Sequence, residues 1–311
     1  MKIIFFGSSR FSVPTLENLY NKGFSILAVV TQPDRQKGRG LKVGMTPVKV
    51  IARKLGLDVF QPEDINSYDS LSYLRGKKPD IFVILAYGQK FSKECLDIPA
   101  IMPINCHASL LPKYRGAAPI NWAIINGEKE TGNTIMKVIP QMDAGPIILQ
   151  SRIKILPEDD SLTMEEKLSK NAAELMVQAL DKIKDGSVTL TGQDKSQVSF
   201  APRLKEQDIR IKWDKTAEQV HNLIRGALSW QAAYTYFRKK RLLIYRSSVL
   251  SSSVVPDVCP GTVTEVTSEG ICVACGRGIV RLHEIQLEGR RRMNICEFLC
   301  GHRIKTSEIF L

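Results

Sequence analysis

Short apolar runs alternate with segments of helical periodicity through the first 184 residues. The apolar runs predict strands, and the amphipathic segments between them predict helices. The expected strands are Lys2–Phe6, Phe24–Thr31, Asp80–Leu85, Ile101–His107 and Thr131–Val138. The expected helices are Val13–Asn21 (capped by Ser12), Pro47–Leu55, Ala118–Ile125 and Leu162–Lys184. Continuously apolar strands alternating with helices indicate an α/β fold, in which helices cover both faces of a mostly parallel sheet.

The alternation stops after Lys184. Residues 186–203 are polar and punctuated by glycine, which predicts a linker. From Ile211 onward, short strands broken by turns follow one helix at Ala217–Arg225. The strands are Ala233–Phe237, Leu242–Ser247, Gly261–Val266, Ile271–Cys275 and Gly278–Ile285. Such strands are typical of a small OB-like β-barrel.

Charge changes this picture, because the chain has a net charge of +12. Residues 203–311 hold 18 Lys and Arg against 11 Asp and Glu, so the last third is the more basic per residue. This excess favours a polyanionic partner such as a nucleic acid, although a merely solvated positive surface is the alternative. The apolar run before Gly7 is too short for a signal peptide or a membrane span, so we expect a cytoplasmic protein.

Seven cysteines raise the question of a metal site. Cys272 and Cys275 form a CxxC, but they lie in an expected strand, where an odd separation sends the sulfurs to opposite faces. Cys296 and Cys300 have the spacing of one helix face and are expected to be small residues of the core. We therefore expect neither a metal site nor a disulfide framework.

The candidate chemistry lies at the end of the strand Ile101–His107. Asn105 and His107 are two residues apart, so their side chains share one face of the strand. A carboxamide beside an imidazole can stabilise a developing oxyanion, and the imidazole can also move a proton. The alternative is a buried polar pair without catalytic function. Ligands of parallel sheets bind at the carboxyl ends of the strands, which is where this pair emerges.

Two further segments add to the site, and a third excludes one kind of ligand. The run Ser109–Pro112 turns the chain with a proline and leaves two leucines for a flat ligand. Asp143 is fixed at a turn between Pro140 and Pro146, where an ordinary turn aspartate is the alternative. The turn after Gly7 lacks the further glycines of a dinucleotide-binding motif.

A long basic loop, Gln32–Val48, carries Arg35, Lys37, Arg39 and Lys42 among three glycines. Loops of this length in compact domains tend to be functional or disordered. The density of cations suits a phosphate backbone, and a solvated insertion is the alternative.

The segment PINCHASLLPKYRGAAPINWAIINGEKETGNTIMKVIPQMDAGPI resembles the signature region of the folate-dependent formyltransferases. It holds their Asn-x-His-x-Ser-Leu-Leu-Pro motif and the downstream Asp-x-Gly. The resemblance extends over the whole chain and is closest to the members that formylate methionyl-tRNA. TQPDRQKGRGLK matches their basic loop, AYGQK their folate-pocket turn, and QLEGRRRMN with FLCGHR their C-terminal domain.

The resemblance implies a role for each matching residue. Asn105, His107 and Asp143 form the catalytic trio. The folate site includes Ser109, Leu110, Leu111 and Pro112. In the basic loop, Arg35, Lys37, Arg39 and Lys42 are the expected tRNA contacts. Cys106 departs from the family pattern, which usually has a valine or another small residue there, and it has no expected catalytic role.

The resemblance also implies the organisation and the reaction. We expect a Rossmann-like catalytic domain over residues 1–188, a linker over 189–205 and an OB-like tRNA-binding domain over 206–311. The expected co-substrate is 10-formyltetrahydrofolate, with no tightly bound cofactor and no metal, and the expected acceptor is methionyl initiator tRNA. We expect a monomer that does not bind membranes.

Other readings remain open at this point. Formyltransferases that act on glycinamide ribonucleotide or on a sugar nucleotide, and the hydrolase domain of formyltetrahydrofolate dehydrogenase, use the same chemistry with other acceptors. The basic loop and the basic last third argue against all three. A tRNA-binding module with an inactive catalytic fold requires a missing catalytic residue, and the sequence lacks none.

Overall fold

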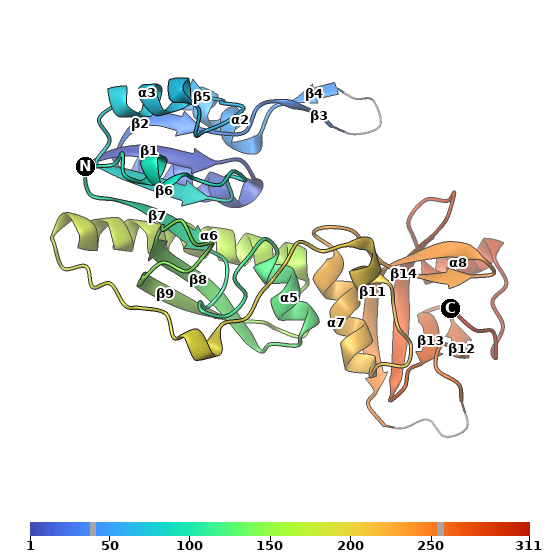
Figure 1. The fold of residues 1–311 in the computed structure, drawn as a ribbon. Helices are drawn as coiled ribbons and strands as arrows, with labels where there is room; N and C mark the ends of the chain where they lie inside the picture. The colour runs from blue at the N-terminus through green and yellow to red at the C-terminus, as the bar shows by residue number, and fades with distance from the viewer. Residues whose placement is uncertain (38–41, 254–257) are drawn as a thin grey trace. The chain divides into compact units, whose positions relative to one another are not determined.

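The computed structural model describes residues 1–37, 42–253 and 258–311 (Figure 1). The chain divides into two compact units. The first unit comprises Met1–Gly116, Glu130–Ile153 and Glu165–Phe200. The second comprises Ala117–Lys129, Lys154–Met164 and Ala201–Leu311. Within the described ranges, no helix is long and apolar enough to cross a membrane.

A seven-stranded sheet organises the first unit, in the order β5-β2-β1-β6-β7-β8-β9. Its strands are β1 (Lys2–Gly7), β2 (Ser25–Val30), β5 (Val59–Phe60), β6 (Ile81–Leu85), β7 (Met102–His107), β8 (Glu130–Lys137) and β9 (Ile147–Lys154). Pairing is parallel from β5 to β7, and β8 runs antiparallel to β7. The prediction of a mostly parallel sheet is confirmed, while the edge strand β9 was not predicted.

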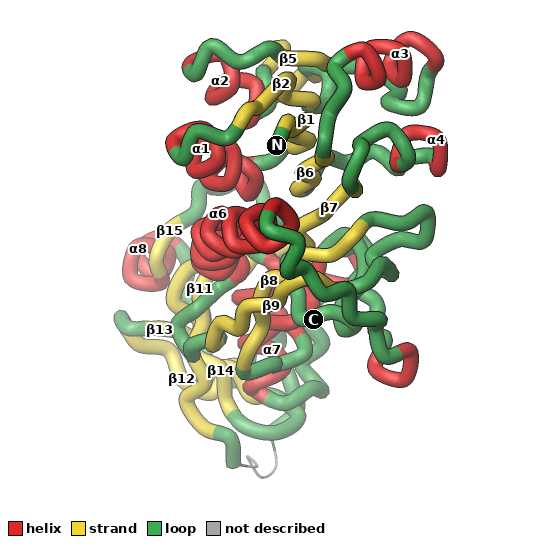
Figure 2. Tube along the Cα trace, turned by 90° about the vertical axis from the view of Figure 1, so that its left-hand side faces the viewer, coloured by secondary structure: helices red, strands yellow, loops and turns green. Residues whose placement is uncertain are grey.

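Helices cover both faces of this sheet. Figure 2 shows α1 (Val13–Asn21), α2 (Pro47–Lys54) and α6 (Ser161–Lys184) on one side, with α3 (Tyr68–Gly76) and α4 (Lys93–Leu96) on the other. This double cover explains the continuously apolar strands, since every residue from Ile3 to Phe6 has no exposed surface. Two helices, α3 and α4, were not predicted.

The start of α1 corrects one detail. Ser12 occupies the cap position, but its side chain does not cap the helix. The Ser12 hydroxyl instead donates to the carbonyl of Leu85 at 2.6 Å, which ties the turn after β1 to the end of β6. The Ser12 hydroxyl therefore bonds to the end of a neighbouring strand rather than to the first turn of the helix.

The predicted basic loop begins and ends as a hairpin. β3 (Arg35–Lys37) pairs antiparallel with β4 (Lys42–Gly44). Arg39 lies outside the described residues.

The second unit is built on an antiparallel sheet in the order β10-β11-β14-β13-β12, with β15 beside β14. Its strands are β10 (Ala233–Phe237), β11 (Lys240–Ser251), β12 (Val263–Thr267), β13 (Gly270–Ala274), β14 (Ile279–Leu287) and β15 (Met293–Asn294). The last residues close the sheet on itself. Phe310 N donates to the carbonyl of Gly261 beside β12, and Leu311 exchanges two hydrogen bonds with Tyr236 of β10. The predicted OB-like arrangement is thus confirmed.

Two helices of this unit pack tightly, α5 (Pro119–Ile125) and α7 (Ala217–Ala227). Asn121 donates to the carbonyl of Gly226 at 2.7 Å. A Cβ atom at Gly226 would lie 2.7 Å from the Ile125 side chain, so glycine is what allows this close approach. The segment around Asn121 therefore packs with the C-terminal residues. The structure also has short 3-10 helices at Arg10–Ser12, Lys195–Gln197 and Glu206–Ile209.

The last helix corrects the expectation for two cysteines. Helix α8 (Ile295–Gly301) forms, but Cys296 and Cys300 are exposed rather than part of the core. Ile295 and Phe298 are buried instead. Cysteines at i and i+4 share a helix face, and in α8 that is not the face that Ile295 and Phe298 bury.

Half-buried His221 on α7 makes the stability of the second unit sensitive to pH. Its Nδ1 atom lies 2.9 Å from the Ser247 hydroxyl. Burial, with Arg225 and His283 nearby, lowers the pKa of His221 to about 4. The unfolded chain takes up this proton near pH 6.5, whereas the folded chain does not until about pH 4. The contribution of His221 to the stability of the folded unit is therefore complete above pH 6.5 and is lost as the pH falls toward 4.

We predict that the free energy of unfolding of the second unit falls by at most about 3 kcal/mol on account of His221 between pH 7 and pH 4. His221→Gln should reduce this slope, because glutamine does not titrate. Denaturant titrations of both proteins, monitored at several pH values, measure this slope. An unchanged slope in His221→Gln would show that this proton is not the cause.

Candidate active site

The candidate residues emerge where three parallel strands end together. β1, β6 and β7 pair in parallel, so their carboxyl ends lie at one edge of the sheet. Asn105 and His107 share one face at the end of β7. Cys106 between them is buried, and burial raises the pKa of its thiol. The cysteine is thus an unreactive packing residue, as the alternation of the strand predicts.

His107 is held by a backbone carbonyl seven residues further on. Its Nε2 atom lies 2.8 Å from the carbonyl oxygen of Tyr114. A carbonyl only accepts hydrogen bonds, so Nε2 carries the hydrogen and donates it. The bond leaves Nδ1 as the ring nitrogen that can exchange a proton with a ligand. Sequence reasoning missed Tyr114, because a main-chain acceptor leaves no mark on residue type.

Asp143 approaches this free nitrogen. Its Oδ2 atom lies 3.7 Å from His107 Nδ1 and accepts a hydrogen bond from Gly116 N at 2.9 Å. Both side chains are largely buried, with 8% and 14% of their surface exposed. The structure therefore brings together the aspartate and the histidine that lie 36 positions apart in the sequence.

The turn that carries Asp143 is unusual. Asp143 has a φ of +50°, in the left-handed region that non-glycine residues rarely adopt. Two residues on, a Cβ atom at Gly145 would lie 1.7 Å from the carbonyl oxygen of Lys137. Only glycine fits there, which gives the Asp-x-Gly motif a steric explanation.

The Asn105 side chain remains open. It is half-buried, and among the described residues none hydrogen-bonds to its carboxamide. A half-buried amide costs little only if water or a ligand satisfies it. Asn105 is thus a donor available at the strand end, next to the His107–Asp143 pair.

Ser109–Pro112 is held from within the protein. The Ser109 hydroxyl is buried and donates to the carbonyl of Lys113 at 2.6 Å. Leu111 is buried, whereas Leu110 and Pro112 are half-buried. The Thr134 hydroxyl of β8 donates to the Ser109 carbonyl at 2.7 Å and accepts from Leu111 N at 3.1 Å. The folate-site role of these four residues stays a prediction.

The base of the basic hairpin is fixed by two polar contacts. The hydroxyls of Thr31 and Thr46 lie 2.7 Å apart, and the Lys49 ammonium donates to the Asp34 carboxylate at 2.5 Å. The Lys49 ammonium, together with the amide of Gln61, lowers the pKa of the Asp34 carboxyl. Both contacts join the strand that leads into the hairpin to the helix that follows it.

Arg35 is the one hairpin cation whose side chain the structure describes. Arg35 is exposed. Lys37 and Lys42 pair through their backbones across the hairpin. Their role as tRNA contacts, like that of Arg39, stays a prediction.

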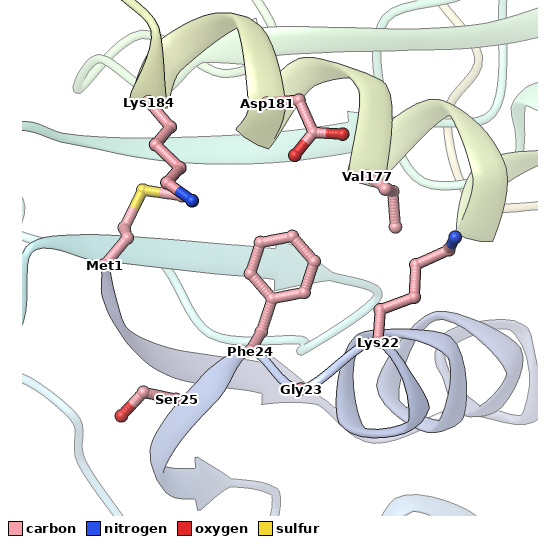
Figure 3. A pocket seen from close by; sticks show the side chains of 8 residues that line it. All are labelled: Met1, Lys22, Gly23, Phe24, Ser25, Val177, Asp181 and Lys184. Atoms are coloured by element: carbon pink, nitrogen blue, oxygen red, sulfur yellow. The ribbon is translucent and has the colours of Figure 1, made fainter.

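One cavity lies away from this edge (Figure 3). It has a volume of about 430 Å³ and is lined by Met1, Lys22, Gly23, Phe24, Ser25, Val177, Asp181 and Lys184. The Phe24 ring points into it from the start of β2, facing α6. Since β1 and β2 begin here, the cavity is at the amino ends of the strands, and no candidate catalytic residue lines it. Within the described residues, no group of three His, Cys, Asp or Glu side chains is placed to hold a metal ion.

Comparisons with known proteins cover the whole chain. A family model described as formyl transferase matches residues 1–180, and one described as formyl transferase, C-terminal domain, matches residues 203–303. Methionyl-tRNA formyltransferase of Acetivibrio thermocellus is 41% identical over 309 residues, covering 99% of each chain. The protein of the same name from Geobacter metallireducens is 42% identical over 305 residues, covering 98% of this chain and 97% of its own.

A solved structure shares the fold at lower identity. WlaRD, a sugar 3N-formyl transferase crystallised in the presence of dTDP and 5-N-formyl-THF, gives a TM-score of 0.68 at 19% identity. The match covers 94% of this chain and 99% of that one.

We predict that Thr134→Val destabilises the first unit by about 2 kcal/mol, because Leu111 N and the Ser109 carbonyl lose a buried partner. Thr15→Val is the matched control, since its buried hydroxyl has no partner among the described residues. That control should be neutral or slightly stabilising. Urea unfolding of both variants measures the difference, and equal stabilities would contradict the role of Thr134.

Proposed function

Since the chain belongs to the formyl transferase family over both of its domains, we propose that it transfers the formyl group of 10-formyltetrahydrofolate to the free α-amine of methionyl initiator tRNA. Membership confirms the resemblance that the motifs indicate. The observation that carries the proposal is the site itself, where the open Asn105 amide lies beside a His107 that is paired with Asp143.

The acceptor is supported by the relatives. Those at 41% and 42% identity over nearly the full length of both chains are methionyl-tRNA formyltransferases. A small amine, a sugar nucleotide or water as acceptor is not favoured, and the likeness to a sugar formyltransferase at 19% identity concerns the fold.

The catalytic groups act as donors and as a proton path. When the amine attacks the formyl carbon, Asn105 and His107 donate hydrogen bonds to the formyl oxygen as negative charge develops on it. Asp143 orients Nδ1 of His107. The Asp143 carboxylate accepts the proton that the attacking amine loses, and this proton passes toward the folate nitrogen that departs. Losing one oxyanion donor should lower turnover about a hundredfold, or about 3 kcal/mol of barrier.

The substrates occupy surfaces on both units. Leu110, Leu111 and Pro112 form one wall of the folate site beside the catalytic pair, with Ser109 holding that wall in place. The basic hairpin contacts tRNA phosphates through Arg35, Lys37, Arg39 and Lys42. The basic C-terminal unit adds further tRNA contacts, and its net charge supports this role.

The enzyme acts as a monomer in the cytoplasm, where charged initiator tRNA is used for translation. The cytoplasmic location is supported by relatives named as methionyl-tRNA formyltransferases, and the net charge of +12 suits such a polyanionic substrate.

The test is transfer of labelled formyl from 10-formyltetrahydrofolate, with methionyl initiator tRNA, glycinamide ribonucleotide, a 4-amino-sugar nucleotide and water as competing acceptors. We predict formylation of the charged tRNA alone, and a turnover at least about a hundredfold lower in His107→Ala, although this variant should still bind tRNA. Cys106→Val is the control on the opposite face of the same strand and should keep nearly full activity. Transfer only to a small acceptor would show that methionyl initiator tRNA is not the acceptor. Full activity of His107→Ala would contradict the proposed mechanism.

We predict that replacing Arg39 and Lys42 together with alanine weakens tRNA binding and lowers the slope of log affinity against log salt by about 1 to 2. The control removes two cations elsewhere, Lys93→Ala with Lys170→Ala, both exposed and paired to acidic residues four positions away. Binding titrations across salt concentrations measure both variants. If the hairpin variant had the same slope as this control, the hairpin would not be part of the tRNA interface.

A further inference from the structure

The segment after α6, predicted as a linker, runs along the catalytic loops. Thr191 exchanges two backbone hydrogen bonds with Ile147 at the start of β9. Further on, Ser199 Oγ accepts from Tyr114 N at 2.9 Å, and the Ser199 carbonyl accepts from Arg115 N at 2.9 Å. Residues 191–199 are thus tied to the loop whose Tyr114 carbonyl holds His107.

Gln193, between these points, contacts the second catalytic loop. Its amide nitrogen donates to the carbonyl oxygens of Asp143 and Gly145, both at 2.8 Å. Its amide oxygen accepts from Arg115 Nε at 3.1 Å and from Arg115 Nη2 at 2.7 Å. Every hydrogen-bonding site of this carboxamide is used.

This network fixes the orientation of the Gln193 amide. A flipped amide would set its oxygen against two carbonyls and its NH₂ group against a guanidinium, and neither arrangement can form a hydrogen bond. Gln193 therefore acts as a bridge with a defined direction. One end holds the backbone of Asp143, and the other holds the loop that supplies Tyr114 and Gly116.

We propose that Gln193 is a positioning residue of the formyl transfer reaction, which holds the Asp143 turn so that its carboxylate meets His107 Nδ1. The inference rests on the proposed function for its kinetic readout. Asp143 needs such support, because its left-handed φ of +50° is unfavourable for an aspartate. Gly116 N holds the carboxylate, and Gln193 holds the main chain on either side of Ala144.

Two variants separate positioning from folding. Gln193→Ala removes the whole bridge. Gln193→Glu keeps the size of the side chain and the acceptor for Arg115, but it replaces the two donors with a carboxylate that faces the Asp143 and Gly145 carbonyls. Gln197→Ala is the matched control, because Gln197 is exposed in the same segment and its amide donates to Asp194 rather than to either catalytic loop.

We predict that both Gln193 variants lower kcat for formyl transfer by about 10- to 100-fold, with KM for either substrate changed less than about threefold. Gln197→Ala should match wild type. The second readout is NMR of the histidine rings, of which the chain has four. The His107 ring signals should shift in Gln193→Glu, while those of His221, His283 and His302 stay in place.

The outcomes are distinct. Wild-type kcat and unshifted His107 signals in both Gln193 variants would overturn the inference. Signals that move for all four histidines would indicate a structural role and would also overturn it. If the wild-type enzyme transferred no formyl group, the proposed function would be wrong. The NMR shift of the His107 ring signals in Gln193→Glu would still test whether Gln193 positions Asp143.

Discussion

The hydrogen bond from His107 Nε2 to the Tyr114 carbonyl is the interaction on which the site depends. It fixes which ring nitrogen carries the hydrogen, and so it decides that Nδ1 faces Asp143. To bring a carbonyl back onto the ring within seven residues, the chain must turn sharply after β7. Tyr114 and Gly116 both take positive φ values, 61° and 125°, to achieve this turn. The backbone conformation of the loop is therefore the one that brings the Tyr114 carbonyl to the His107 ring.

Such a loop is stable only if other interactions offset the free-energy cost of its left-handed backbone conformation. A non-glycine residue in the left-handed region costs about 1 to 3 kcal/mol, and both Tyr114 and Asp143 are in it. Each buried hydrogen bond returns about 1 kcal/mol. Bonds from Thr134, Gln193 and Ser199 reach the two loops from β8 and from the segment after α6. The support for the site is thus spread over parts of the chain distant in sequence.

Sequence pattern predicted what depends on neighbours in the chain. The bounds of α1 and β10 match their expected residues, and alternation along β7 placed Cys106 away from Asn105 and His107. Strand alternation also singled out Asn105 and His107 as candidates, whereas the catalytic role of Asp143 came from the family motif. The role of Gln193 was missed, because its partners lie 48 to 78 residues earlier and a polar, glycine-punctuated segment resembles any linker. The exposed Cys296 was misjudged, because spacing indicates a shared helix face but not which face is buried.

Polar contacts fix the base of the basic hairpin, as other polar contacts fix the catalytic loops. Lys49 is buried against Asp34, so its charge is neutralised locally and adds little to the field that a phosphate backbone meets. A buried ion pair contributes little net stability, but breaking it is costly, which makes it a better device for fixing geometry than for strengthening a fold. With Thr31 and Thr46 joined beside it, the pair sets where the two hairpin strands begin. Lys49 is therefore a support of the hairpin base rather than one of the cations proposed to contact tRNA.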